Sequence, residues 1–121
     1  MGNVQAQVRA AVEIEGAVGA MVVDSDSGMV LATEGGSQAL DLEIAAAGNS
    51  EVVKAKRKTM KALRLDDQIE DILITLNKDY HIIRPLRSND AVFFYVVINR
   101  NSGNLALARR KIAELERDLV L

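Results

Sequence analysis

The run Ala91–Ile98 most constrains the fold, because it is unbroken by any polar residue and carries large side chains at odd and even positions alike. In an extended strand, successive side chains point to opposite faces of the sheet. Phe93 and Tyr95 would therefore lie on one face and Phe94 on the other. The run is too short for a membrane helix, which needs about 20 residues. The sequence thus predicts a strand that is apolar on both faces, and a sheet that needs cover on both sides.

A second segment, Ala17–Val23, has the same two-sided character, with Val18, Ala20 and Val22 expected on one face and Met21 and Val23 on the other. It is joined to the apolar run Met29–Thr33 by Asp24-Ser25-Asp26-Ser27-Gly28, which predicts a β-hairpin. This connection resembles the start of a calcium loop. Its glycine stands one position too early, however, and no glutamate follows where the pattern requires one, so a turn is favoured.

Three helices and three further strands account for most of the remaining chain. Apolar spacing predicts a first helix that ends near Glu15, with Gly16 as the stop. The stretch Leu40–Leu65 is rich in helix-forming residues and predicts a long second helix. Leucine, isoleucine and alanine between Leu105 and Leu119 recur at helical spacing, after an N-cap expected at Asn101-Ser102. The further strands are expected at Ile69–Leu76, at Tyr80–Arg84, where Pro85 ends the ladder, and at Ala91–Ile98.

The resulting order is α-β-β-α-β-β-β-α, within a chain of 121 residues that suits one domain, 1–121. Three helices can cover both faces of the sheet. We therefore predict a three-layer α/β sandwich with a five-stranded, mostly antiparallel sheet.

The composition excludes several kinds of chemistry. The chain has no cysteine, which excludes disulfides and thiolate sites, and its one histidine, His81, excludes a two-histidine metal site within one chain. Its glycines match neither the phosphate-binding loop nor the dinucleotide fingerprint. We predict no enzymatic activity, no cofactor and no metal site, and a structural or surface role for His81.

The charge and the N-terminal sequence bear on location and partners. The net charge of −2 gives no case for a nucleic-acid partner or an anionic membrane. The N-terminus lacks a basic region followed by an apolar run, so no secretory signal is indicated. We expect a cytoplasmic protein without nucleic-acid binding or membrane insertion.

Two features of the second helix invite a functional interpretation. Six cations and no acid lie between Val52 and Leu65, which indicates either a solvated helix end favoured by the helix dipole or a docking patch for an acidic partner. These cations are Lys54, Lys56, Arg57, Lys58, Lys61 and Arg64. Six small residues also occur in a row, Ala45-Ala46-Ala47-Gly48-Asn49-Ser50. Gly48 is less favourable than alanine in a helix by about 1 kcal/mol, so close packing against a second helix is our hypothesis for it.

Runs along nearly the whole chain carry a family resemblance, although no single motif is diagnostic. They are Glu15–Asp24, Gly28–Ala32, Ala45–Asn49, Ile72–Thr75, Tyr80–Pro85 and a final helix that starts near Asn104. Together they resemble the roadblock domain of the dynein light-chain roadblock family, whose bacterial members include the regulator of the gliding-motility GTPase. The resemblance implies a roadblock, profilin-like fold.

The resemblance also implies a non-enzymatic dimer in which the second helices pack together and the third strands pair across a two-fold axis. An unpaired apolar strand is an aggregation hazard that such pairing removes. The interface residues that it implies are Ala45, Ala46, Gly48, Asn49, Val52, Val53, Ile69, Asp71, Leu73 and Thr75.

Two functions follow as hypotheses. The first is a homodimeric regulator or platform that binds a small Ras-like GTPase and modulates its nucleotide state. Arg57, Arg64, Arg84 and Arg87 are expected to be exposed and are the candidates for an arginine finger, and nothing in the sequence selects one. The second is a structural adaptor, as in the dynein light chains, without effect on nucleotide turnover.

Overall fold

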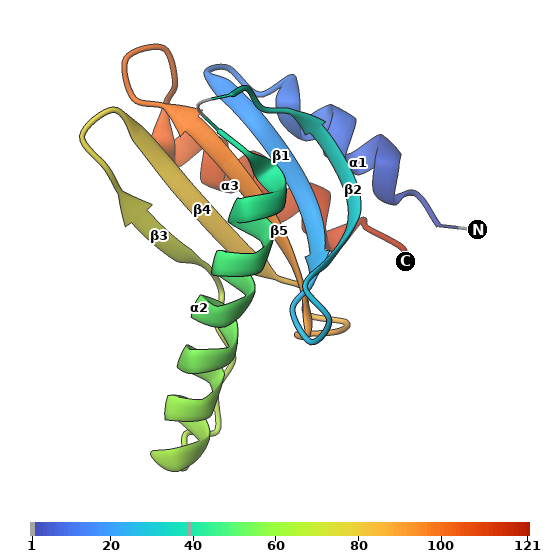
Figure 1. The fold of residues 1–121 in the computed structure, drawn as a ribbon, viewed down its shortest axis with the longest axis vertical. Coiled ribbons are helices and arrows are strands. Elements are labelled where there is room, and N and C mark those ends of the chain that lie inside the picture. Colours follow the sequence, from blue (N-terminus) through green and yellow to red (C-terminus); the bar gives the residue numbers. More distant parts are fainter. Residues whose placement is uncertain (1, 39) are drawn as a thin grey trace.

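Five strands form one sheet in the order β2-β1-β5-β4-β3, and every neighbouring pair is antiparallel (Figure 1). The structure is a computed structural model that describes residues 2–38 and 40–121. The predicted fold class and the order of the elements are confirmed. The elements are α1 (Val4–Val12), β1 (Ala17–Asp24), β2 (Met29–Gly35), α2 (Leu42–Ala62), β3 (Ile72–Thr75), β4 (Asp79–Pro85), β5 (Val92–Asn99) and α3 (Leu105–Arg117).

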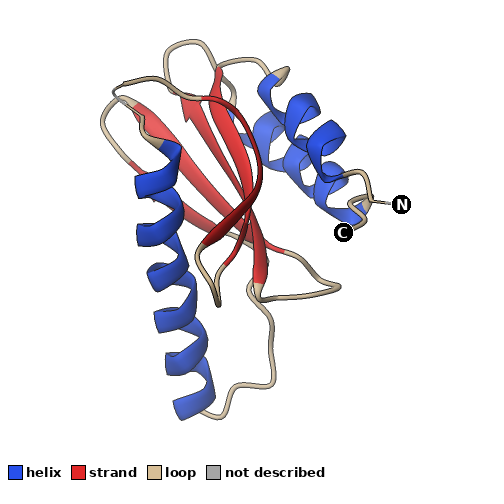
Figure 2. Ribbon diagram, turned by 45° about the vertical axis from the view of Figure 1, so that its right-hand side comes forward, coloured by secondary structure: helices blue, strands red, loops and turns tan. Residues whose placement is uncertain are grey.

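The sheet is covered on both faces, as the two-sided strands require (Figure 2). Phe94 and its even-numbered neighbours in β5 pack against α1 and α3, together with Ile112 of α3. Phe93 and Tyr95 pack on the opposite face against α2, where Ala46 and Val53 meet them. All of these side chains are almost completely buried. Strand β5 lies at the centre of the sheet and is therefore the middle of both cores.

The predicted face of Val18 is wrong. Val18 packs on the α2 side of the sheet with Met21, whereas Ala20 and Val22 lie on the side of α1 and α3. The pairing of β1 with β5 shifts register between Ala17 and Gly19. An irregularity of this kind breaks the strict alternation of a strand, so residues on its two sides no longer follow one period.

Strand β3 is shorter than the predicted Ile69–Leu76. Ile72 lies opposite Ile83, so continuing this register would bring Glu70 opposite Pro85. Proline has no N–H to donate to the ladder, and pairing therefore stops. Residues 66–71, here called the α2–β3 connection, belong to no helix or strand, and the backbone groups of residues 66–70 form no hydrogen bond with another described backbone group.

The helices begin and end at residues somewhat different from those predicted. Asp41 caps α2 by accepting hydrogen bonds from the backbone N–H groups of Glu43 and Ile44 at 3.0 and 3.2 Å. Asn104 caps α3 by accepting from Leu107 N at 3.0 Å, so the N-cap predicted at Asn101-Ser102 is wrong. The backbone N–H groups of that pair donate instead to the side chain of Asn99, in the turn before the helix.

Helix α2 extends well past the end of the sheet, and the α2–β3 connection returns from its far end to β3 (Figures 1 and 2). Over the sheet, α2 lies mainly on β1 and β2. None of the helices described is long and apolar enough to cross a membrane.

Candidate functional site

The two outer strands of the sheet differ in how their edges are protected. The pairing of β2 with β1 shifts register at Val22/Val23 and leaves Leu31 without a partner, which is a bulge. Arg9 and Gln5 of α1 also bind Glu34 of β2 at 3.1 and 2.8 Å. Bulges and charged neighbours are common protections of an edge. The register of β3 with β4 is regular, and the outward edge of β3 pairs with no other described strand, so β3 is the edge open to pairing.

The exposed side of α2 contains a glycine that the chain's own packing does not require. A Cβ added at Gly48 would meet no atom within 4 Å. Val52 lies one turn further along and is 39% exposed, and Ile44, one turn earlier, is 71% exposed. Residues four apart share a helix face. Ile44, Gly48 and Val52 therefore form an apolar stripe along this face, here called the Gly48 stripe, and its middle position has no side chain.

The structure divides the predicted dimer residues into three groups. Ala46 and Val53 are 1% and 0% exposed in the core beneath α2, so they offer no surface to a second copy, and their assignment to the interface is corrected. Asp71 is held by Arg109 of α3 through two hydrogen bonds of 2.8 Å. The others are exposed or half-buried, namely Ala45, Gly48, Asn49, Val52, Ile69, Leu73 and Thr75.

Five of the six cations lie in the C-terminal half of α2, and Arg64 lies just after the helix. Lys54 pairs with Glu51 at 2.8 Å, and Arg57 pairs with Asp90 at 3.5 Å. No acidic group of the described residues forms an ion pair with the other four, which are exposed: Lys56, Lys58, Lys61 and Arg64. Arg64 follows the helix end with φ +57°. This geometry is shared by a solvated helix end and by a docking patch for an acidic partner.

A cleft of about 650 Å³, here called the α2–β3 cleft, lies where α2 passes the end of the sheet. Its walls are the C-terminal half of α2, the α2–β3 connection, and the end of β4 with the residues that follow. Arg57 and Lys61 contribute from α2, and Arg84 and Arg87 from the sheet side. Sequence reasoning missed this cleft, because its walls come from segments far apart in the chain.

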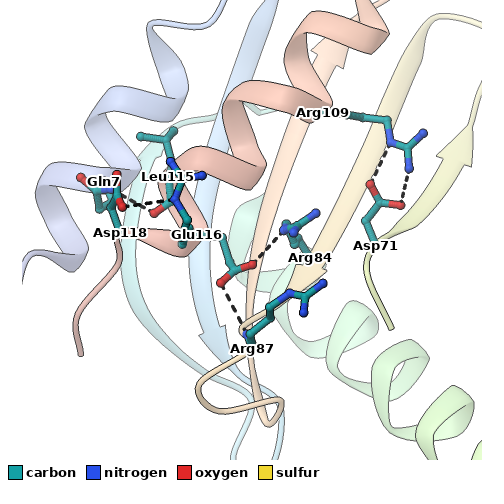
Figure 3. A network of polar contacts seen from close by, with 9 residues as sticks. Gln7, Asp71, Arg84, Arg87, Arg109, Leu115, Glu116 and Asp118 are labelled. Carbon is teal, nitrogen blue, oxygen red and sulfur yellow. Dashed lines mark hydrogen bonds and ion pairs between the residues drawn. The ribbon is translucent and has the colours of Figure 1, made fainter. Parts of the chain in front are cut away.

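Arg84 and Glu116 form a buried ion pair beside this cleft (Figure 3). Arg84 Nε donates to Glu116 Oε1 at 2.9 Å, and the two side chains are 10% and 4% exposed. The Arg87 backbone N–H donates to the other carboxylate oxygen at 3.4 Å. The expectation that Arg84 is exposed is therefore wrong, and its burial removes it from the residues considered for an arginine finger.

His81 lies on the α2 face of β4 and binds the hydroxyl of Tyr95, with 2.8 Å between Tyr95 Oη and His81 Nδ1. The two rings meet edge to face, with centroids 5.6 Å apart. Burial lowers the pKa of His81 from its usual value, and the nearby Asp79 opposes this shift. Burial raises the pKa of Tyr95. Within residues 2–38 and 40–121, no three histidine or acidic side chains are gathered to hold a metal ion.

The fold resembles solved structures along nearly the whole chain. MglB from Myxococcus xanthus superposes with a TM-score of 0.81 at 18% identity, covering 94% of this chain and 82% of that one. A Roadblock/LC7 domain from Streptomyces avermitilis gives 0.78 at 14% identity, with 93% and 91% covered. The chain has the roadblock fold. The gliding protein MglB from Thermus thermophilus has the same roadblock fold, with a TM-score of 0.67 at 15% identity and 93% and 87% covered. No protein-family model and no curated protein matches the sequence.

Proposed function

We propose that this roadblock-fold chain is a non-enzymatic, cytoplasmic homodimer that binds a small Ras-like GTPase and modulates its nucleotide state. The observation that carries the dimer is the coincidence of two open surfaces, the regular edge of β3 and the stripe around Gly48. Because α2 lies mainly over β1 and β2, the α2 side of β3 and β4 has room for a second helix. Ile74 and His81 are only half-buried there, which supports cover from a second copy.

The dimer is tested by Gly48→Leu. The added side chain meets open space within the chain, so the monomer should fold and gain roughly 0.5–1 kcal/mol of helix stability. In the dimer the same side chain would project from the middle of the stripe and separate the α2 helices of the two copies. We expect a monomer by light scattering. Its unfolding midpoint should equal or exceed that of the parent chain at dilutions where the parent is dissociated.

Ala47→Leu is the matched control, because Ala47 is also exposed but lies about 100° around the helix from Gly48. This variant should keep the dimer mass. If Gly48→Leu is as dimeric as the parent chain, packing of the second helices is excluded.

The GTPase partner is supported by the fold shared with MglB and by the unpaired cations of α2. Cations that pair with no described acid can orient an acidic surface of a partner. We expect the purified chain to retain a small GTPase from an extract of its source, with retention that depends on whether GDP or a GTP analogue is added. Purified GTPase should then hydrolyse GTP at a changed rate in the presence of the chain.

The double variant Lys56→Glu with Lys58→Glu should weaken this retention, whereas Lys111→Glu on α3 should not. Retention that is equal with both nucleotides, together with an unchanged hydrolysis rate, would favour the structural adaptor instead. Coupling between partner and nucleotide must be reciprocal, so a true regulator also shifts the nucleotide affinity of the GTPase.

A further inference from the structure

The single histidine of the chain lies on the part of the sheet that the proposed second copy would cover. His81 is half-buried on the α2 side of β4, and its neighbour across the ladder is the half-buried Ile74 of β3. Both residues lie beside the room left for a second helix, because α2 of the same chain lies mainly over β1 and β2. Histidine is the side chain whose charge changes near physiological pH. His81 is therefore placed where its charge can influence assembly.

The two ring nitrogens of His81 have different surroundings. Nδ1 lies 2.8 Å from the hydroxyl oxygen of Tyr95, a side chain buried beneath α2. No other described group forms a hydrogen bond with the ring. Since no buried side-chain nitrogen of the described residues lacks a partner, Nε2 must reach solvent. In the single chain, water can therefore hydrate a protonated imidazole at this nitrogen.

The groups around His81 decide how the ring responds to further burial. Burial lowers the pKa of His81, and Asp79, two residues earlier on the same face of β4, opposes this shift. Arg100 packs over the ring of Tyr80 at 5.0 Å, on the opposite face of the sheet. The neighbours on β3, β5 and α2 are the uncharged side chains of Ile74, Tyr95 and Asn49. Even with Asp79 beside it, the ring thus loses affinity for a proton when water is removed.

The Gly48 stripe of a second copy would cover His81 without supplying a counter-charge. The stripe itself is uncharged, and the two acids next to it on α2 are already engaged. Asp41 caps the helix by accepting from the backbone N–H groups of Glu43 and Ile44, and Glu51 pairs with Lys54 at 2.8 Å. A protonated ring under this stripe would lose its water and gain no acid. Burial of a charge without a partner is unfavourable, so the dimer should favour the neutral imidazole.

We propose that His81 is a pH-sensitive switch of the dimer, in which the neutral imidazole permits two copies to assemble and the protonated imidazole opposes assembly. This inference rests on the proposed dimer and adds the condition under which the dimer separates. Each dimer covers two copies of His81, so both rings contribute to the effect. Mild acidification thus releases monomers that remain folded.

The test measures the dissociation constant of the dimer by sedimentation equilibrium at about pH 7.5 and about pH 6.0. In the parent chain this constant should rise about fivefold at the lower pH, since both rings must release their protons on assembly. His81→Gln keeps a polar side chain near the Tyr95 hydroxyl without the titration, and its constant should change by less than about twofold. Lowering the pH brings the net charge of −2 closer to zero, which reduces repulsion between copies and cannot cause their separation.

A proton NMR titration of the chain without a histidine tag gives a second measurement, which still tests the proposal if His81→Gln does not fold. The chain has one histidine, so its imidazole signals need no further assignment. The pKa of His81 should be lower in the parent dimer than in the monomeric Gly48→Leu variant. A parent chain that is monomeric even at the higher pH would overturn the proposed dimer and this switch together. A dimer with the same affinity at both pH values, an equal change in His81→Gln, or equal pKa values in the dimer and the monomer would overturn the switch alone.

Discussion

At the scale of single residues, Glu116 holds two parts of the molecule together. Its carboxylate accepts from Arg84 of β4 and from the backbone N–H of Arg87, which follows β4. This carboxylate therefore joins α3 to the side chain of Arg84 and to the backbone at Arg87. Sequence reasoning could not find this pair, because 32 residues separate its members and the periodicity of α3 gives Glu116 no special place.

Glu116→Gln should destabilise the fold by about 3 kcal/mol, because it leaves the buried Arg84 charge without a counter-charge. Glu114→Gln is the control. Glu114 approaches Arg110 at 3.9 Å on the exposed side of the same helix, so its loss should change stability by less than about 1 kcal/mol. Urea unfolding of the three proteins measures both effects. Equal stabilities would show that the buried pair has no special weight.

His81 should make the stability depend on pH in a defined direction. Its folded pKa lies below the unfolded value of about 6.5, so the unfolded chain binds the proton first as the pH falls. The contribution of neutral His81 is therefore present above about pH 6.5 and is lost as the pH falls toward the folded pKa. The free energy of unfolding should decrease more between about pH 7.5 and about pH 5.5 in the parent chain than in His81→Gln. Parallel decreases would rule out this role.

At the scale of elements, type and order could be predicted from the sequence, while boundaries depended on tertiary partners. Helix α3 was found because its apolar residues repeat at helical spacing, a local property. Its N-cap was misplaced because Asn101, Ser102 and Asn104 are all good capping residues, and only the direction of the chain after β5 selects one. Strand β3 was predicted too long because the effect of Pro85 appears only when the register with β4 is known.

Asn104→Ala should destabilise the protein by about 1 kcal/mol, the usual effect of losing a side chain that caps a helix. Ser102→Ala should have a smaller effect, because the Ser102 hydroxyl bonds only to the half-buried Asn99 side chain and caps no helix. Thermal unfolding of the two variants under the same conditions separates these expectations. A larger loss with Ser102→Ala would place the cap where the sequence suggested.

At the scale of the whole molecule, the three layers could be predicted from the strands that are apolar on both faces. The sheet edges and the exposed side of α2 could not. No sequence pattern in β2 or β3 shows which of the two edge strands is protected. The bulge at Leu31 and the ion pair of Arg9 with Glu34 appear only in the folded chain. Gly48 was singled out because helix propensity alone could not explain a glycine within a helix, and the structure places Gly48 and Val52 on the exposed side of α2. Ala46 and Val53 were assigned to the wrong side, since small or apolar residues suit a core and an interface equally.

The difference between the edges gives a prediction for assembly. Leu73→Lys places a charge on the open edge, where it should oppose pairing with a second copy and give a monomer. Leu31→Lys is the matched change on the opposite edge, at a residue of similar exposure, 45% against 36%. It should keep the dimer mass in light scattering. Loss of the dimer in both variants, or in Leu31→Lys alone, would contradict pairing through β3.

The lack of backbone pairing in residues 66–70 has one more consequence. This stretch is the covalent bridge between a portion that contains α1, β1, β2 and α2 and a portion that contains β3, β4, β5 and α3. The long ladder between β1 and β5 joins the same portions without it. A peptide bond cut within the bridge would therefore break no ladder, and the two fragments, produced separately, should reassemble into one working molecule.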